Sequence, residues 1–403
     1  MLDVEGSLSY LVAKVHGLDS FHEIKEKGRQ MSLKSSTSSQ NFINHFKIIK
    51  NLLPKHKRKA PPSLNDHIPF GAIPTNHMLI CDFLPRKNGW QNPEILPYKP
   101  FSLTPNSVVF HYGQTIFEGL KAYRSENNEK EIFLFRPDKN AERMAKSAQR
   151  MGMEPFPEDL FVHCIKELVK IDKDWILPSP GAMYIRPSMI ALDRGVSYRA
   201  SQDYRFFIIL SPSKNYFTSE TTISVYIERN LSRAAIGGAG EAKCGGNYAS
   251  SLLPMKIAKD KGAEQVLWLD AKEHRYVEEA GAMNVMFVYQ DRIVTPALSG
   301  SILHGITRAS VIQIARQLNI PVEETKVDIN QIIADAKTGK LTEMFACGTA
   351  AVISPVGCLL DGDEKVEINN GKIGEISMRL KSELVGIQSG KLPDPYGWRQ
   401  LIS

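Results

Sequence analysis

Helix-like and strand-like patterns alternate along the chain from Pro69 onward. Apolar residues three and four positions apart predict helices over residues 141–153 and 157–171, and after Asn247, Thr307, Asp328 and Gly374. Runs rich in β-branched and aromatic residues predict strands at residues 78–83, 132–135, 183–190, 206–210, 222–227, 265–269, 285–289 and 292–295. This order of elements predicts an α/β (α+β) protein.

The chain is also long enough for more than one folded domain. At 403 residues it exceeds the roughly 100–200 residues that one domain usually holds. The polar stretch at residues 211–220, with one proline between two strand patterns, is the best internal linker. We therefore predict a smaller domain over residues 67–212, a linker over 213–221 and a larger domain over 222–403, preceded by an extension over 1–66.

Composition excludes several classes of protein. Hydrophobic residues make up 42% and charged residues 23% of the chain, which is ordinary for a globular protein and argues against wholesale disorder. No apolar run reaches the roughly 18 residues that cross a bilayer, so we expect no integral membrane protein. The five cysteines are never spaced C-x-x-C, which argues against a disulfide scaffold and a metal site and favours a reducing compartment.

The net charge of +6 belongs to one segment near the N-terminus. Residues 27–65 contain nine Lys or Arg and no Asp or Glu, so the rest of the chain is mildly acidic. We therefore expect no nucleic-acid binding by the folded body.

That basic segment is typical of a mitochondrial presequence. It is rich in Ser and free of acidic residues, and it carries an apolar stripe at helical spacing (Phe42, Ile43, Phe46, Ile49, Leu52 and Leu53). Residues 1–30 contain acidic residues, so the presequence interpretation would fit better if translation began at Met31. The alternative is a solvated extension without a targeting role, in a cytoplasmic protein; an arm that binds nucleic acid or a membrane surface is the third interpretation.

A lysine framed by glycines is the most unusual local feature, in GGAGEAKCGGNY at residues 237–248. The Walker phosphate loop does not fit, because Ala242 and Cys244 flank the lysine where Gly and Ser or Thr are required. The dinucleotide fingerprint does not fit either, because Lys243 stands at its third glycine position. Two interpretations stay open: a structural glycine loop with a surface lysine, or a nucleophilic amine that forms a Schiff base.

Three further segments change the balance between these interpretations. VEEAGAMNV at residues 277–285 presents Glu279 at a strand end, and FACGTA at 345–350 is a strand running into a turn of small residues. HGITR at 304–308 precedes an apolar helical repeat, so its backbone N–H groups could hold a phosphate. A lysine, a carboxylate and a phosphate-binding helix start together are the parts of a pyridoxal phosphate site.

With HYGQTIFEGLKAY at residues 111–123 and LFRP at 134–137, these segments closely resemble the branched-chain amino-acid aminotransferases, and the eukaryotic members most. The likeness runs from about Phe70 to Trp398. It implies a two-domain fold-type-IV pyridoxal 5'-phosphate enzyme, built as a homodimer in which the smaller domain completes the partner's site. The implied reaction is the reversible transfer of the amino group of leucine, isoleucine or valine to 2-oxoglutarate, giving branched 2-oxo acids and glutamate.

The resemblance also implies roles at the cofactor. Lys243 would carry the cofactor as a Schiff base and then move the substrate proton, and Glu279 would pair with the ring nitrogen. Tyr248 would donate to the ring hydroxyl oxygen. The phosphate would be held by Arg136, for which a structural salt bridge is the alternative, and by the groups of Ile306, Thr307 and Thr349.

At the substrate, the resemblance implies that the N–H groups of Thr349 and Ala350 and the hydroxyl of Tyr112 hold the α-carboxylate. Arg186 would reach the distal carboxylate of glutamate. The apolar side chain would be walled by Phe70, Phe117 and Tyr184, for which plain core packing is the alternative. Since such pockets separate ligands that differ by one methylene by only about 1–3 kcal/mol, all three branched amino acids should be accepted.

One departure from the family matters. Mammalian members carry a C-x-x-C pair after the Gly-Thr turn, whereas Ala351 and Ser354 stand here, so we expect no thiol–disulfide switch. We expect Cys244 and Cys347 to be small buried side chains. The rival functions are another fold-type-IV enzyme, such as a D-amino-acid transaminase or an aminodeoxychorismate lyase, and a non-catalytic scaffold, which would require a damaged site.

Overall fold

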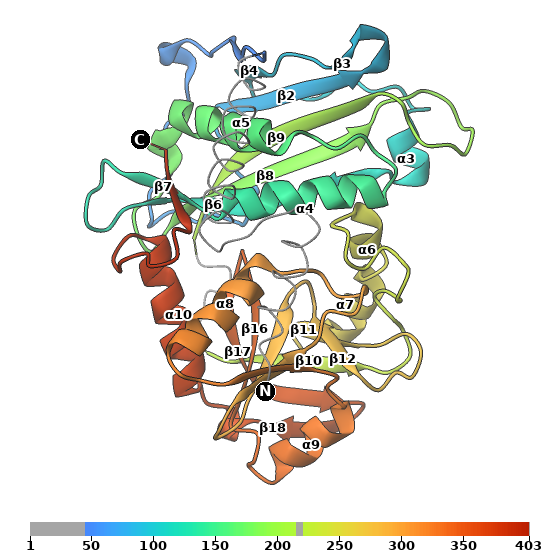
Figure 1. Ribbon diagram of the computed structural model, residues 1–403, viewed down its shortest axis with the longest axis vertical. Helices are drawn as coiled ribbons and strands as arrows, with labels where there is room; N and C mark the ends of the chain where they lie inside the picture. The colour runs from blue at the N-terminus through green and yellow to red at the C-terminus, as the bar shows by residue number, and fades with distance from the viewer. Residues whose placement is uncertain (1–44, 215–220, 403) are drawn as a thin grey trace, which may run out of the picture. The chain divides into compact units, whose positions relative to one another are not determined.

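The computed structural model describes residues 45–214 and 221–402 (Figure 1). The chain divides into a unit over Met1–Lys47 and a body over Ile48–Ser403, and the following description concerns the body. Most of the predicted extension and residues 215–220 of the predicted linker lie outside the described residues.

The first sheet has ten strands, in the order β1-β4-β2-β9-β8-β6-β7-β19, with β3 on β2 and β5 on β8. Its core is the antiparallel pair β8 and β9, each ten residues long. The strands are β1 (Ile49–Lys50), β2 (His77–Leu84), β3 (Gly89–Trp90), β4 (Glu94–Pro97), β5 (Thr115–Phe117), β6 (Leu120–Arg124), β7 (Ile132–Phe135), β8 (Ala182–Ala191), β9 (Tyr204–Ser213) and β19 (Arg399–Leu401).

Two helices, α4 (Pro137–Arg150) and α5 (Glu158–Ile171), lie along one face of the first sheet (Figure 1). The α5 helix forms because its apolar residues recur at helical spacing and are buried against the sheet. Pro137 opens α4, where its fixed φ suits the first helical position. The remaining helical segments here are α3 (Val108–Tyr112), η1 (Lys55–Lys57), η2 (Pro85–Lys87) and η3 (Lys173–Trp175).

The second sheet has nine strands, in the order β12-β11-β10-β17-β16-β13-β14-β15, with β18 on β17. Its strands are β10 (Ile223–Glu228), β11 (Gln265–Leu269), β12 (Val277–Ala280), β13 (Asn284–Val288), β14 (Ile293–Pro296), β15 (Val322–Thr325), β16 (Glu343–Gly348), β17 (Val352–Asp361) and β18 (Glu364–Glu367). Its helical segments are α6 (Gly245–Ala249), α7 (Leu252–Asp260), α8 (Ile306–Gln317), α9 (Ile329–Lys337), η4 (Asn369–Gly371) and α10 (Glu375–Gln388).

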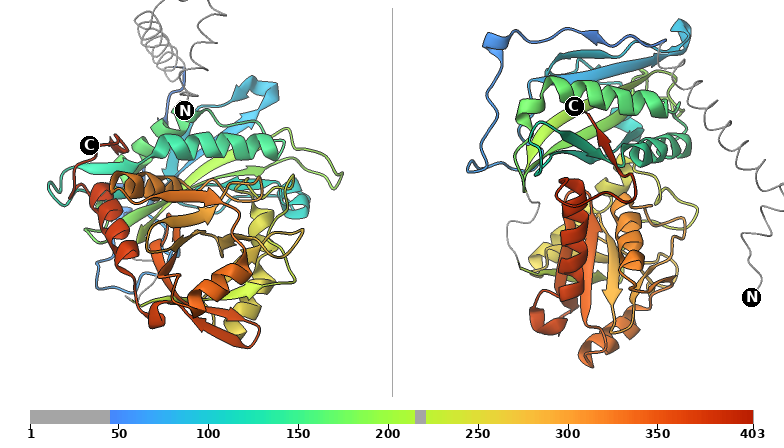
Figure 2. Two further views of the ribbon diagram at one scale, coloured as in Figure 1. Left: turned by 60° about the horizontal axis from the view of Figure 1, so that its bottom comes forward. Right: turned by 60° about the vertical axis from the view of Figure 1, so that its left-hand side comes forward.

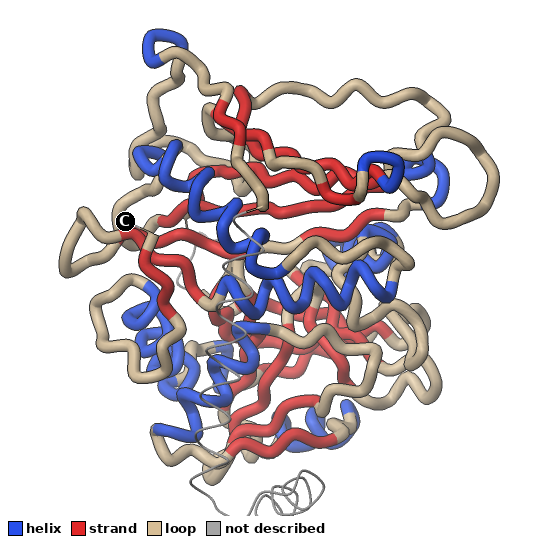
Figure 3. The backbone as a smooth tube through the Cα atoms, turned by 45° about the horizontal axis from the view of Figure 1, so that its top comes forward, coloured by secondary structure: helices blue, strands red, loops and turns tan. Residues whose placement is uncertain are grey.

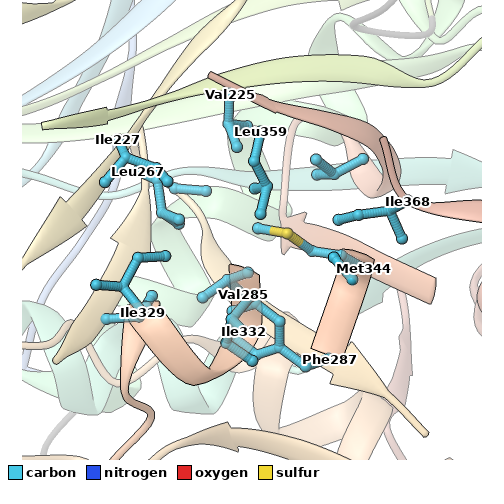
Figure 4. Close-up of a cluster of buried hydrophobic side chains, with 14 of the residues drawn as sticks. Val225, Ile227, Leu267, Val285, Phe287, Ile329, Ile332, Met344, Leu359 and Ile368 are labelled. Carbon is cyan, nitrogen blue, oxygen red and sulfur yellow. The ribbon is translucent and has the colours of Figure 1, made fainter. Parts of the chain in front are cut away.

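Both faces of the second sheet are buried. Val285 and Phe287 of β13 point into a cluster that includes residues of α9 (Figure 4). Met286 and Val288, on the opposite face, pack into a second cluster with residues of α8 and α10. Since successive side chains of a strand alternate between faces, a continuous apolar run such as β13 requires cover on both sides.

The two sheets are tied together by the end of the chain. After α10 the chain returns to the first sheet, where β19 pairs with β7 (Figure 2). Phe135 of β7 and Trp398 belong to the same buried cluster as α8 and α10, with ring centroids 5.5 Å apart. Figure 3 shows α4 where the two sheets approach one another. The last strand of the predicted larger domain therefore belongs to the first sheet, and the division at residues 213–221 stays a prediction.

Most predicted elements are confirmed, and their ends differ for local reasons. The strands predicted at residues 132–135 and 265–269 are β7 and β11. The helix predicted from residue 141 begins at Pro137. Residues 211–213, predicted as linker, are the end of β9, because they pair with buried positions of β8. Among the described helices, none has the length and apolar character needed to cross a membrane.

Candidate active site

A cavity of about 200 Å³ lies between the two sheets and takes its walls from both. The first sheet and α4 contribute Phe117, Gly119, Arg143, Tyr184 and Arg186, with Phe70 beside them. The second sheet and its loops contribute Lys243, Tyr248, Gln265, Ala282, Met283, Asn284, Leu303, residues 305–307 and residues 347–351. The described sequence motifs thus converge on one space.

Lys243 has a fixed backbone and an amine that faces this cavity. Its N–H donates to the Ser147 hydroxyl at 2.9 Å, and its carbonyl accepts from the Phe117 N–H at 3.0 Å. The Nζ amine donates to the Tyr248 hydroxyl at 2.9 Å. The loop that carries it passes so close to the Ser301 carbonyl that a side chain at Gly240 would overlap it. Lys243 is half-buried, so the interpretation as a surface lysine is wrong.

Aromatic rings wall the cavity on one side. Phe117 lies 4.8 Å from the ring of Tyr248, and Phe70 lies edge-on to Tyr184 at 4.7 Å. Phe70 is 38% exposed, so plain core packing does not explain it. Gly119 leaves room for the Tyr184 hydroxyl, which a Cβ at this position would overlap.

Arg186 lies among these rings. Its guanidinium is centred 4.7 Å from the ring of Phe117, and Nη2 donates to the Tyr184 hydroxyl at 3.0 Å. Its Nε is buried and has no hydrogen-bond partner among the described residues. A buried guanidinium N–H without an acceptor favours binding of an anion at this edge of the cavity.

One end of the cavity is suited to a doubly charged anion. Gly305 caps α8 without a side-chain hydrogen bond, and no described residue accepts from the N–H groups of Ile306 and Thr307. The guanidinium of Arg143 lies beside this helix start, with Nη1 donating to the His304 carbonyl at 3.0 Å. Free N–H groups, the positive end of a 12-residue helix and an arginine together favour the binding of a phosphate.

Glu118 holds Arg143 in this position. Its carboxylate is fully buried and accepts from Arg143 Nε at 2.6 Å and Nη2 at 2.8 Å, and from Asn140 Nδ2 at 2.7 Å. Burial acts to raise the pKa of the Glu118 carboxyl, but the Arg143 guanidinium outweighs burial and holds this pKa below its usual 4.5. Glu118 therefore stays ionised and pins the arginine.

Glu279 lies away from the helix start. It lines an adjoining cavity of about 310 Å³ that shares Tyr248, Gln265, Ala282 and Leu303 with the first. Its carboxylate accepts from the Leu303 N–H at 2.7 Å and lies 3.3 Å from Arg233 Nε. Burial raises the pKa of Glu279, and the charges of Arg233 and Lys243 offset part of this increase. Because burial disfavours an uncompensated negative charge, the Glu279 carboxylate favours a ligand that presents a cationic N–H group.

The hairpin loop between β16 and β17 closes another side. Gly348 pairs with Val352, which leaves Thr349, Ala350 and Ala351 as the loop. No described residue accepts from the N–H groups of these three residues, and all three line the cavity. Val352 has a φ of 62°, which is strained for a β-branched residue. Consecutive free N–H groups of this kind form a concavity for an anion.

The structure brings together most of the predicted site residues, but not Arg136. Arg136 precedes α4; its Nη1 donates to the Ser310 hydroxyl at 2.8 Å, and its guanidinium lies 5.0 Å from the centre of the Trp398 ring. It lines an adjoining cavity, which shares Arg143, Gly305 and Ile306 with the first, and no described carboxylate forms an ion pair with it. The role predicted for Arg136 at the phosphate end stays a prediction, and Arg143, two helical turns further along α4, lines both cavities and lies beside the helix start.

Tyr112 also lies outside the cavity of its own chain. It is on the surface at 38% exposure, its hydroxyl donates to the Val196 carbonyl, and its ring lies 5.5 Å from that of Tyr198. Cys244 and Cys347 are buried free thiols, as predicted.

Sequence reasoning missed Arg143, Glu118 and Arg233. Glu118 stood inside a segment that the sequence singled out, and Arg143 lies on the helix predicted over residues 141–153. Arg143 could have been raised as a candidate because this helix follows directly on the LFRP segment at residues 134–137. Nothing local in the sequence marks Arg233.

The fold and this site define a class of enzyme, which comparison with known proteins supports. The model of the family "Amino-transferase class IV" matches residues 115–357. Branched-chain-amino-acid transaminase 1 of Bacillus subtilis is 44% identical over 346 residues, which cover 85% of this chain and 96% of that protein. A branched-chain-amino-acid aminotransferase of Mycolicibacterium smegmatis is 44% identical over 336 residues, covering 82% of this chain and 90% of that protein.

Among solved structures, a branched-chain amino acid aminotransferase of Escherichia coli is 26% identical, with a TM-score of 0.65. The alignment covers 77% of this chain and 97% of that one. The chain belongs to the class IV aminotransferases and, within them, to the branched-chain-amino-acid aminotransferases. The resemblance and the fold-type-IV prediction are thereby confirmed, and the rival fold-type-IV reactions are disfavoured.

The Glu118–Arg143 pair predicts a pH-dependent loss of stability. Because the folded-state pKa of Glu118 lies below 4.5, the pair stabilises the fold above pH 4.5, and this contribution is lost as the pH falls through the folded-state pKa. Glu118→Gln should lower the free energy of unfolding by about 3 kcal/mol at pH 7. The difference from the parent protein should shrink below pH 4.5, measured by urea unfolding at several pH values.

Glu142→Gln is the matched control, because Glu142 also pairs with basic residues of α4 but lies at the surface. Its loss should stay under about 1 kcal/mol. Equal losses for the two variants, or a Glu118 effect that grows in acid, would contradict the role given to the buried pair.

Proposed function

We propose that the protein uses pyridoxal 5'-phosphate to transfer the amino group of leucine, isoleucine or valine reversibly to 2-oxoglutarate. The observation that carries this proposal is the Lys243 amine, held in a cavity with a phosphate-binding helix start at one end and the buried carboxylate of Glu279 in the adjoining space. When bound, the cofactor supplies an aldehyde that condenses with amines and a ring that accepts an electron pair.

The donors of the site fit this cofactor. A phosphate would accept from the free N–H groups of Ile306 and Thr307 and from the guanidinium of Arg143, and the Thr349 side chain lines the same cavity. Arg143 takes the role that the sequence had suggested for Arg136. Glu279, which lies 3.3 Å from Arg233 Nε, would pair with a protonated ring nitrogen. Tyr248 would donate to the ring hydroxyl oxygen.

Lys243 would act twice in the reaction. Its Nζ would first hold the cofactor covalently and, once displaced by the substrate amine, would take the proton from the substrate Cα. The anchored backbone fixes where this amine starts, and the Tyr248 hydroxyl at 2.9 Å orients it.

The remaining walls would bind the substrate. The free N–H groups of Thr349 and Ala350 would hold the α-carboxylate, and the rings of Phe70, Phe117 and Tyr184 would contact the branched side chain. Arg186, whose Nε lacks a partner among the described residues, would take the distal carboxylate of glutamate when that substrate replaces a branched one. A single pocket can thus serve both halves of the exchange.

A homodimer and the two-domain organisation belong to this proposal. Near Tyr112 the surface carries apolar side chains that are largely exposed: Phe110 at 61%, Val196 at 65% and Tyr198 at 91%. Contact with a second copy would cover them, and Tyr112 could then reach the α-carboxylate in the partner's site.

The acid-free basic composition of residues 27–65 supports delivery to mitochondria, with the cytoplasm as the alternative.

The central test is spectral. Protein supplied with pyridoxal phosphate should show the visible band of the lysine-bound cofactor, lose it with leucine and regain it with 2-oxoglutarate. Lys243→Ala should abolish these changes, because no other amine faces the cofactor in the described part of the site. Lys256→Ala, which alters an exposed lysine of α7, should leave them intact. A protein that stays colourless with the cofactor would end the proposal.

The two arginines make a second, paired prediction. Arg143→Lys keeps the charge but loses the planar fork that must serve both Glu118 and a phosphate. The loss of one charge-assisted hydrogen bond, about 1.5 kcal/mol, should raise the Kd for pyridoxal phosphate roughly tenfold. Arg136→Lys should change this Kd by less than about twofold. Titration of the cofactor-free protein measures both, and the opposite ranking would restore Arg136 to the phosphate end.

A further inference from the structure

Lys121 is a buried lysine that the proposed chemistry does not use. It lies on β6, is 6% exposed and donates from Nζ to the Ala350 carbonyl at 2.9 Å. No described carboxylate forms an ion pair with it. Burial alone lowers its pKa to about 8. A single carbonyl is a poor match for a buried ammonium, so this charge is under-compensated.

The hydrogen bond joins the two sheets at the substrate end of the cavity. Lys121 pairs with Tyr184 across β6 and β8 in the first sheet, whereas Ala350 is in the β16–β17 loop of the second. Lys121 therefore lies behind a wall of the cavity, with the loop between its ammonium and the cavity.

The backbone N–H groups of the loop lack acceptors, just as the ammonium of Lys121 lacks a carboxylate. The N–H groups of Thr349, Ala350 and Ala351 have no acceptor among the described residues, and the loop continues into the strained Val352. In a planar trans peptide the C=O and N–H point in opposite directions, so the Ala350 carbonyl, which accepts from Lys121, turns the Ala351 N–H away from Lys121. Hydrogen bonding at the carbonyl also polarises the peptide and strengthens its N–H as a donor.

We infer that Lys121 is a positioning residue for the substrate α-carboxylate: its ammonium holds the Ala350 carbonyl, so that the Ala351 N–H joins those of Thr349 and Ala350 on the cavity side of the loop, and it supplies the counter-charge behind them. The inference rests on the proposed function and deepens it. The carboxylate never touches Lys121; it binds the loop, and the buried charge makes that binding stronger.

The test compares a substrate that has the α-carboxylate with one that lacks it. Lys121→Met keeps the length of the side chain and removes the charge. In the holoprotein it should raise the KM for leucine and for 2-oxoglutarate about tenfold each while kcat changes less than about threefold. The slower reaction with 3-methylbutylamine, which is leucine without its carboxylate, should be unchanged. Lys121→Arg should recover most of the leucine affinity.

Two controls keep the outcomes distinct. The visible cofactor band reports on the proposed function. A parent protein without this band would end the proposed function and this inference with it, whereas a Lys121→Met variant that keeps the band and the parent KM would overturn this inference alone. If Lys121→Met does not fold, Lys121→Gln, which keeps a donor to Ala350 but no charge, should weaken leucine binding in the same way. Equal effects on leucine and on 3-methylbutylamine, or an unchanged KM, would overturn the inference.

Discussion

The buried ion pair between Glu118 and Arg143 is the interaction on which the site depends most. It joins the start of β6 to α4, and Arg143 extends the connection to the loop before α8. Each partner would be costly to bury alone, so together they fix three segments that are distant in sequence. The same arginine presents its guanidinium at the helix start, where an anion can bind. In the proposed function, fold stability and phosphate binding thus depend on the same pair of side chains.

Close to this pair, Lys243 combines a backbone that is held in place with an amine that has few contacts. The backbone of Lys243 is pinned to α4 and to β5, while its amine makes one hydrogen bond among the described residues, to Tyr248. The two sheets that form the cavity are held together by the shared cluster containing Phe135 and Trp398 and by the return of β19 to the first sheet. The proposed function asks the Lys243 amine both to hold the cofactor and to accept a proton, and a fixed backbone with a free amine suits both roles.

Local features of this protein were predictable from the sequence, and long-range partners were not. The glycine-framed lysine, the Glu279 strand end and the start of α8 could be located because each depends on residues close in the chain. The choice between Arg136 and Arg143 depends on Ser310 and Glu118, which are 174 and 25 residues away respectively. The pattern that predicted the helix could not tell which of its arginines faces the cavity. Tyr112 lies outside the cavity of its own chain, and its proposed role requires a second copy.

The most direct test of the account is to reduce the protein with borohydride in the presence of pyridoxal phosphate and map the modified peptide. Among the described residues that line the cavity, Lys243 is the one lysine, and the buried Lys121 lies behind the 349–351 loop, where its amine donates to the Ala350 carbonyl. The account predicts a single adduct, on Lys243. An adduct on Lys121 or on another amine, or the absence of any adduct, would contradict it.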